Sequence, residues 1–150
     1  MNTYDAQIFE ADIHVGQVLN TLEKNGILDD TLIILTSDHG EQFGEQGMYG
    51  EHAAAVEPDL LVPLIIRYPK KEKAGTVLNE LVYSQDIIPT IWEYAKAEAN
   101  ESDFKSLQPL IDGKVASLYP YLVCDHGLYT STRAIIQKEW KLFLTYTPGY

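Results

Sequence analysis

Apolar residues recur every three or four positions over the first 22 residues of the chain. This spacing places them on one face of an α-helix, so we expect an amphipathic helix here. Asn25-Gly26 supplies a stop, because glycine readily adopts the left-handed conformation that closes many helices. The apolar positions are Tyr4, Ile8, Ala11, Val15, Val18, Leu19 and Leu22.

Two short, continuous apolar runs follow, Thr31 to Thr36 and Val62 to Arg67. Runs of this kind, bounded by turn residues, are typical of strands that are buried on both faces in a parallel sheet. Pro63 lies near the start of the second run, where a missing N–H donor is tolerated. Residues 37–50 are polar and rich in Gly and Glu, and we expect no regular structure there.

The second half of the chain predicts one helix and then a small sheet. A cap among residues 84–86 can start a helix that runs to about Lys96, with Pro89 in its first turn. Residues 97–117 are polar and predict a mobile connection. Three closely spaced apolar runs then predict an antiparallel meander. These runs are Tyr121–Cys124, Arg133–Gln137 and Trp140–Thr145, with Lys138-Glu139 as a turn.

Together these elements predict an α/β fold. We expect a partial, mostly parallel sheet flanked by helices, followed by a small antiparallel C-terminal sheet. The corresponding division is residues 1–96 for the α/β part, 97–120 for a connection and 121–150 for the antiparallel subdomain.

Composition narrows the class of protein. The 150 residues contain 11 Lys and Arg against 22 Asp and Glu, a net charge of −11. Such a chain repels nucleic-acid backbones and anionic membranes, so we expect neither as a partner. No apolar run approaches the roughly 20 residues that span a bilayer, and no signal segment opens the chain. Cys124 is the single cysteine, which excludes an intrachain disulfide and a multi-cysteine metal site.

The first apolar run leads into Ser37-Asp38-His39-Gly40, the most informative polar motif of the sequence. Ligands of open α/β sheets lie just beyond the carboxyl ends of the strands, where Asp38 and His39 stand. A carboxylate oxygen and an imidazole nitrogen at such a turn can bind one divalent cation. Gly40 lets the backbone bend there without a Cβ clash. The alternative is a capped turn with a surface histidine.

Other polar residues are weaker candidates. His52 lies thirteen positions after His39, in a loop that either returns to the same sheet edge or is simply solvated. Cys124-Asp125-His126-Gly127 repeats the Asp-His-Gly tripeptide, but we favour a buried structural cysteine over a nucleophile or a second metal site. Four glutamates could bind a metal or take part in acid–base chemistry, or they could simply be solvated in an acidic loop. They are Glu41, Glu45, Glu51 and Glu57.

Several short motifs, each unspecific alone, follow one another along the chain. They are Tyr4-Asp5, Gly26 to Thr31, Ser37 to Glu41, Gly44 to Gly47, Val62 to Pro69, Ser84 to Thr90, Arg133 to Ile136 and Trp140 to Leu142. In this order they resemble the C-terminal half of a sulfatase, a member of the alkaline-phosphatase-like superfamily. The resemblance covers nearly the whole chain and is weakest over residues 97–120.

The resemblance implies that Asp38 and His39 bind the catalytic divalent cation. We expect calcium, with magnesium, manganese and zinc as alternatives that two ligands do not separate. The implied substrate of the complete enzyme is a sulfate ester. His52 then contacts the substrate oxyanion, which we favour, or binds a second metal. Many sulfatases have a sulfate-binding Lys where this chain has Glu51, and the carboxylate inverts the local charge.

Two features of sulfatases are missing from these 150 residues. One is the Cys/Ser-x-Pro-x-Arg motif that yields the formylglycine nucleophile, and the other is an earlier Asp pair for the metal. We therefore interpret the chain as a fragment of a sulfuric ester hydrolase that carries metal ligands but no nucleophile and is inactive alone. Two alternatives stay open. One is a piece of a two-metal phosphatase or phosphotransferase, and the other is a non-catalytic module whose sheet edge is covered by a second copy or by a missing N-terminal half.

Overall fold

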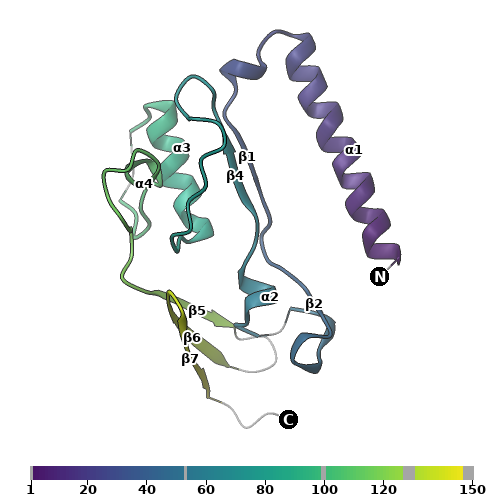
Figure 1. Ribbon diagram of the computed structural model, residues 1–150, viewed down its shortest axis with the longest axis vertical. Helices are drawn as coiled ribbons and strands as arrows, with labels where there is room; N and C mark the ends of the chain where they lie inside the picture. Colours follow the sequence, from purple (N-terminus) through teal and green to yellow (C-terminus); the bar gives the residue numbers. More distant parts are fainter. Residues whose placement is uncertain (1, 53, 99–100, 127–130, 147–150) are drawn as a thin grey trace. The chain divides into compact units, whose positions relative to one another are not determined.

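The computed structural model describes residues 2–52, 54–98, 101–126 and 131–146 (Figure 1). It contains both helices and short strands, which is the α/β character that the sequence predicts. Among the described residues, no helix combines the length and the apolar character that a membrane span requires.

The chain divides into two compact units, and both apolar runs are split between them. The first unit comprises Met1–Ile34 and Ile65–Thr76, and the second comprises Leu35–Leu64 and Val77–Tyr150. All polar candidates of the sequence, from Asp38 to His126, therefore belong to the second unit.

The first unit begins with helix α1 (Asn2–Lys24), which confirms the predicted helix. Asp5 in its first turn and Lys24 in its last turn both complement the helix dipole. Gly26 adopts φ 67° directly after the helix, so the predicted left-handed stop is also confirmed. The apolar stripe is largely exposed, since 56% of the surface of Ile8 and 60% of that of Val18 face solvent.

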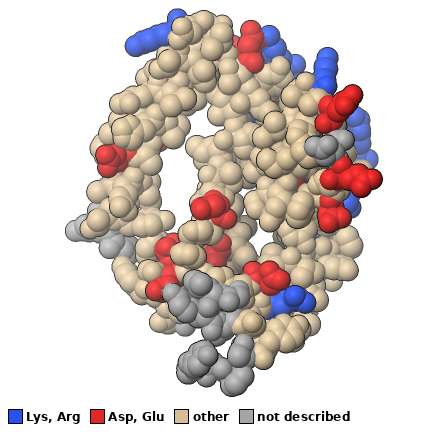
Figure 2. Space-filling view, turned by 180° about the vertical axis from the view of Figure 1, so that it is seen from behind, with Lys and Arg blue, Asp and Glu red and all other residues tan. Residues whose placement is uncertain are grey.

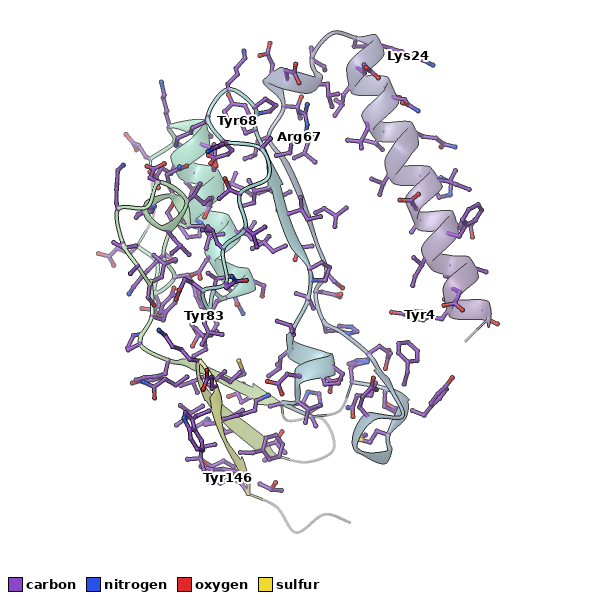
Figure 3. All side chains as sticks on the ribbon, in the orientation of Figure 1. Tyr4, Lys24, Arg67, Tyr68, Tyr83 and Tyr146 are labelled. Atoms are coloured by element: carbon purple, nitrogen blue, oxygen red, sulfur yellow. The ribbon has the colours of Figure 1, made fainter. Side chains whose placement is uncertain are left out.

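A short 3₁₀ helix, η1 (Leu28–Asp30), follows α1 in the same unit. The guanidinium of Arg67 holds this segment (Figure 3). Its Nη1 donates to the carbonyl oxygen of Leu28 at 2.9 Å, and its Nη2 donates to Asp29 Oδ1 at 2.6 Å. The Arg67 side chain thus fixes the turn after α1 to the end of the second predicted strand.

The two apolar runs form strands β1 (Ile33–Thr36) and β4 (Leu64–Arg67), neighbours in a two-stranded sheet. Their existence confirms the predicted strands, but the expected burial on both faces is wrong. Leu35 is exposed, and Ile65 exposes 58% of its surface. In the part of the chain that the structure describes, this sheet has only two strands, so each strand keeps an open edge and few neighbours cover its side chains.

The stretch after β1 is more regular than its composition suggests. It contains β2 (Gln42–Phe43), the 3₁₀ helix η2 (Glu45–Gly47) and β3 (Tyr49–Glu51), and β2 pairs with β3 in antiparallel fashion. The expectation of no regular structure was therefore wrong. Gly44 adopts φ 117°, a left-handed conformation that turns the chain back on itself. A one-turn helix, α2 (Glu57–Leu60), precedes β4 and was also missed.

The predicted helix near residue 84 is present as η3 (Ser84–Asp86) and α3 (Ile87–Ala95). Pro89 lies in the first turn of α3, as expected. Residues 97–117 are not merely a connection, because they contain helix α4 (Gln108–Ile111) and three buried residues. The buried residues are Leu107, Gln108 and Leu110.

A buried carboxylate, Asp86, organises the surroundings of α3. It accepts hydrogen bonds from the backbone N–H groups of Tyr83 (2.8 Å) and Lys105 (3.0 Å) and from the hydroxyl of Tyr119 (2.5 Å). The hydroxyl of Tyr83, labelled in Figure 3, in turn accepts a hydrogen bond from the backbone N–H of Val123 at 2.6 Å. Polar residues that suggest a loop in the sequence are therefore fixed by one buried acceptor.

The C-terminal meander is confirmed in detail. Strands β5 (Leu122–His126), β6 (Thr132–Gln137) and β7 (Trp140–Thr145) form an antiparallel sheet in the order β5-β6-β7. Lys138 adopts φ 47° in the predicted turn. The division into residues 1–96, 97–120 and 121–150 stays a prediction.

On the face that Figure 2 shows, charged side chains lie at several places rather than in one patch. Figure 2 shows acidic side chains in red separated by uncharged surface, with blue Lys and Arg side chains mostly at the margin of this face. This distribution matches the excess of 22 acidic over 11 basic residues in the sequence.

Candidate functional site

Asp38 leaves the end of β1 in a tight local turn. Its Oδ1 accepts the backbone N–H of His39 at 3.0 Å, while the hydroxyl of Ser37 donates to the carbonyl oxygen of His39 at 2.7 Å. The backbone N–H of His39 is the main reason why the pKa of Asp38 lies below its ordinary value. Asp38 is therefore an ionised carboxylate, and 86% of its side chain is open to solvent.

The neighbouring imidazole is oriented by the backbone. His39 Nδ1 lies 2.8 Å from the carbonyl oxygen of Gly40. A carbonyl only accepts hydrogen bonds, so Nδ1 carries the proton and Nε2 keeps its lone pair in the neutral ring. The same hydrogen bond raises the pKa of His39 above its ordinary value. His39 Nε2 lies 3.8 Å from Asp38 Oδ2, so two atoms with lone pairs that can bind a metal ion lie side by side.

This pair fits one divalent cation. Metal–nitrogen and metal–oxygen bonds of about 2.0–2.6 Å allow two ligands of one ion to stand as much as about 4.5 Å apart. The 3.8 Å between Asp38 Oδ2 and His39 Nε2 lies within this span. A histidine whose other N–H is held by a carbonyl is also the usual arrangement at metal sites. Across the described residues, however, no three His, Cys, Asp or Glu side chains converge on one possible metal position.

His52 comes from the loop after β3 and lies directly against this pair. Its ring stacks on that of His39 with 3.9 Å between the ring centroids and an interplanar angle of 21°. Its Nδ1 is 3.6 Å from Oε2 of Glu41, whose side chain is only 22% exposed. The structure therefore brings together Asp38, His39, His52 and Glu41.

Gly40 is required for space rather than for a special backbone angle. Gly40 does not adopt the positive φ seen at other described glycines, so the expected bend is not a left-handed one. A Cβ at this position would lie 1.8 Å from the carbonyl oxygen of Pro58. The N–H of Gly40 donates to the carbonyl oxygen of Asp59 at 2.8 Å. The residue after His39 is thus pressed against α2.

Behind this contact lie two buried polar side chains that sequence reasoning missed. Gln42 is fully buried and Asp59 is 5% exposed. Asp59 Oδ2 accepts hydrogen bonds from Gln42 Nε2 at 2.9 Å and from the backbone N–H of Ala54 at 3.1 Å. Neither residue belongs to a spaced motif, and only the fold reveals a pair whose members lie seventeen residues apart.

The other glutamates named in the sequence have separate surroundings. Glu45 Oε2 accepts the backbone N–H of Phe43 at 2.6 Å, and this hydrogen bond lowers the pKa of Glu45. Glu51 is exposed on β3. Glu57 Oε2 pairs with Lys141 Nζ at 3.0 Å. Among these three, none has a hydrogen bond or ion pair to Asp38 or His39 in the described structure.

The second Asp-His-Gly tripeptide lies on β5, apart from its Gly127, which is outside the described residues. Cys124 is half-buried, and burial raises the pKa of its thiol, which disfavours the reactive thiolate. Asp125 pairs with Arg133, with 3.4 Å between Oδ2 and Nη2. These surroundings support the structural interpretation of Cys124 rather than a nucleophile.

Comparisons with known proteins agree on one family. The family model described as Sulfatase matches residues 1–97. An N-acetylglucosamine-6-O-sulfatase of Bacteroides thetaiotaomicron is 38% identical over 116 residues, which cover 76% of this chain and 20% of that protein. The multifunctional alkaline phosphatase superfamily protein PehA of Trinickia caryophylli is 38% identical over 115 residues, with 75% and 22% covered.

A solved structure is similar over most of the chain. It is of a protein in complex with its substrate, D-glucosamine-2-N,6-O-disulfate, and superposes with a TM-score of 0.81 at 30% identity. The match covers 91% of this chain and 29% of that protein. The chain therefore spans between a fifth and three tenths of the length of these relatives.

Proposed function

Because the chain belongs to the sulfatase family, we propose that it is a part of a sulfuric ester hydrolase and contributes two ligands of the catalytic divalent metal. The ligands are Asp38 Oδ2 and His39 Nε2. The observation that carries the proposal is their separation of 3.8 Å, with the imidazole held by Gly40 in the tautomer that leaves Nε2 free.

Each residue has a defined task in this proposal. Asp38 stays ionised because a backbone N–H stabilises its carboxylate, and His39 directs a neutral nitrogen to the same place. A divalent cation bound there, for which we propose calcium, supplies positive charge that polarises a sulfate-ester oxygen. An acidic chain with a net charge of −11 would otherwise repel such an anion.

His52 is proposed to contact the oxyanion of the substrate. Its ring lies 3.9 Å from that of His39, which supports a position beside the metal ligands. Glu51 brings a carboxylate to the position where many sulfatases carry a lysine, so His52 is the nearer candidate for a hydrogen bond to a sulfate oxygen. The nucleophile is proposed to come from outside these 150 residues, because they contain no Cys/Ser-x-Pro-x-Arg motif.

A manganese titration of the purified chain tests the ligand assignment. We expect saturable Mn²⁺ binding, followed by the electron paramagnetic resonance of the free ion, with Ca²⁺ as a competitor. Asp38→Asn and His39→Ala should each weaken binding by about tenfold or more, because each removes a ligand. Asp103→Asn removes one exposed carboxylate and should leave the affinity unchanged. Equal affinity in Asp38→Asn and the unaltered chain would overturn the assignment.

Hydrolysis of an aryl sulfate tests the missing nucleophile. The chain alone should show no turnover with or without added metal. Robust, metal-dependent turnover by the pure chain would show that it contains its own nucleophile.

A two-metal phosphatase or phosphotransferase is the second candidate. It is supported by the relative PehA, which is named as a multifunctional member of the alkaline phosphatase superfamily, the superfamily that also contains the sulfatases. In this case His52 would bind a second metal. Metal analysis of a complete protein that contains this sequence separates the candidates, since two ions per chain favour phosphate chemistry and one favours sulfate chemistry.

A further inference from the structure

Two half-exposed histidine rings stack at the candidate site, where the Gly40 carbonyl oxygen orients His39 and the Glu41 carboxylate lies beside His52. The side chains of His39 and His52 are 46% and 41% exposed. Their contact is a pair of small imidazoles, and such a contact alone gives little energy to fix two loops. The ring separation of 3.9 Å therefore depends on what holds the backbone behind each histidine.

We propose that Gln42 and Asp59 form a buried clamp that positions His39 against His52. The Gln42–Asp59 clamp consists of these two side chains, the backbone carbonyl of Asp59 and the hydrogen bonds they make. Neither residue touches the candidate metal position, so both are positioning residues. The geometric part of the proposal stands without a metal, whereas its purpose rests on the proposed function.

Asp59 receives hydrogen bonds from both loops that carry the histidines. Its carbonyl oxygen accepts the N–H of Gly40, the residue directly after His39, at 2.8 Å. Its carboxylate accepts the N–H of Ala54, two residues after His52, at 3.1 Å. One buried residue thus fixes the backbone on the C-terminal side of each histidine.

Gln42 completes the arrangement from the strand that follows His39. Its amide nitrogen donates to the same oxygen, Asp59 Oδ2, at 2.9 Å. Gln42 and Asp59 are only 0% and 5% exposed, and Gln42 Oε1 and Asp59 Oδ1 have no hydrogen-bond partner among the described residues, so Asp59 Oδ2 carries the polar contacts of the pair. A shift of either loop would also break a hydrogen bond to Asp59 Oδ2 and leave a further buried polar atom unpaired, which is unfavourable. The clamp therefore favours the observed relative position of the two loops.

Close packing removes the remaining freedom. The Gly40 backbone is so near α2 that a Cβ would lie 1.8 Å from the Pro58 carbonyl oxygen. The loop after His39 therefore has no room to move closer to α2, and the hydrogen bond to Asp59 prevents it from moving away. If the proposed function holds, the clamp sets the distance between a metal ligand and the group that contacts the substrate.

Proton NMR of the histidine rings in the metal-free chain tests the clamp. Stacked rings shift each other's C–H resonances upfield, so we expect upfield signals from His39 and His52. Asp59→Ala should abolish this shift because the Gln42 amide and the Ala54 N–H lose the carboxylate that accepts both, although the hydrogen bond from Gly40 to the Asp59 backbone carbonyl is kept. Asp59→Asn should retain it, since an amide oxygen can still accept both hydrogen bonds. Asp103→Ala, which removes an exposed carboxylate of the same unit, should have no effect.

Gln42→Met provides a second, milder variant that remains informative if Asp59→Ala does not fold. It removes one of the two donors to the Asp59 carboxylate and should reduce the upfield shift. Unchanged fluorescence of Trp92, which lies in the same unit as Gln42 and Asp59, reports that this unit is folded. An upfield shift that persists in folded Asp59→Ala or in Gln42→Met, or that is lost in Asp59→Asn, would overturn the clamp.

A manganese titration of the same variants separates the clamp from the proposed function. If both are right, Asp59→Ala should weaken Mn²⁺ binding by about tenfold or more, as expected for loss of a residue that orients a ligand. If the unaltered chain binds no Mn²⁺, the proposed function fails, while the ring shifts still decide the clamp. If Asp59→Ala loses the ring shift but keeps its Mn²⁺ affinity, the clamp does not serve the metal.

Discussion

Replacing Gly40 by alanine tests how closely the loop after β1 is pressed against α2. The new Cβ would stand 1.8 Å from the Pro58 carbonyl oxygen, about 1.6 Å closer than the 3.4 Å at which ordinary contact begins. Relief requires the two backbones to separate, which breaks the 2.8 Å hydrogen bond from Gly40 N–H to Asp59. Overpacking costs about 1–3 kcal/mol and the lost hydrogen bond about 0.5–1.5 kcal/mol. We therefore expect Gly40→Ala to lower the free energy of unfolding by about 2–4 kcal/mol.

Urea unfolding followed by tryptophan fluorescence measures this change. Both tryptophans lie in the same unit as Gly40, and Trp92 is the reporter because Trp140 is already 79% exposed in the folded chain. With a urea dependence of about 2 kcal/mol per M, the unfolding midpoint should fall by about 1–2 M. The position of Gly40 directly after the metal-ligand pair also predicts weaker Mn²⁺ binding.

Gly16→Ala is the matched control, because it makes the same chemical change in open space. Gly16 lies inside α1, and a Cβ added there would meet nothing within 4 Å. Alanine is favoured over glycine by about 0.8–1 kcal/mol inside a helix, so circular dichroism should show a more stable helix. A Gly40→Ala chain as stable as the unaltered one, or stabilised as Gly16→Ala is, would refute the close-packing argument.

Two further predictions concern pH. The hydrogen bond to Gly40 raises the pKa of His39, so protonation of His39 should displace Mn²⁺ as the pH falls through a value above the ordinary pKa of about 6.5. An Mn²⁺ affinity that stays constant from pH 8 to 5.5 would contradict this. Burial and the Asp86 carboxylate raise the pKa of Tyr119, so the folded state keeps this proton while the unfolded state loses it above about pH 10. The free energy of unfolding should therefore decline above that pH, and urea midpoints measure this decline. In Tyr119→Phe the decline should be shallower. This variant should also be less stable by about 1.5–3 kcal/mol near neutral pH, because it loses the hydrogen bond to Asp86.

The sequence predicted elements well where hydrophobic periodicity was strong. Helix α1, strand β1 and the β5-β6-β7 meander follow directly from apolar spacing, and Gly26 marks the end of α1 as expected. Prediction from the sequence failed where regular structure depends on buried polar contacts. The segment around α4 has the composition of a polar connection, yet the Leu107 N–H donates to the buried hydroxyl of Thr90 at 2.8 Å. Such partners are seventeen residues apart and leave no periodic signal.

The candidate site divides in the same way. The position of Asp38 and His39 beyond β1 could be predicted, because a strand end followed by these side chains is a local pattern. The approach of His52 depends on the β2–β3 turn, which glycine-rich composition concealed. Asp59 could not be found at all, since its role arises from three hydrogen bonds to residues on separate segments. The roles of Asp38, His39 and His52 stay predictions until metal and substrate binding are measured.

The ion pair between Lys141 and Glu57 links the last strand of the chain to the helix that carries Asp59. The Lys141 side chain is only 19% exposed, and its Nζ lies 3.0 Å from Oε2 of Glu57 on α2. A shortened protein that stops before β7 would therefore disturb the turn beneath the two histidines, although the deleted strand lies more than eighty residues further along. Fusions and truncations for biochemical work should leave this strand intact.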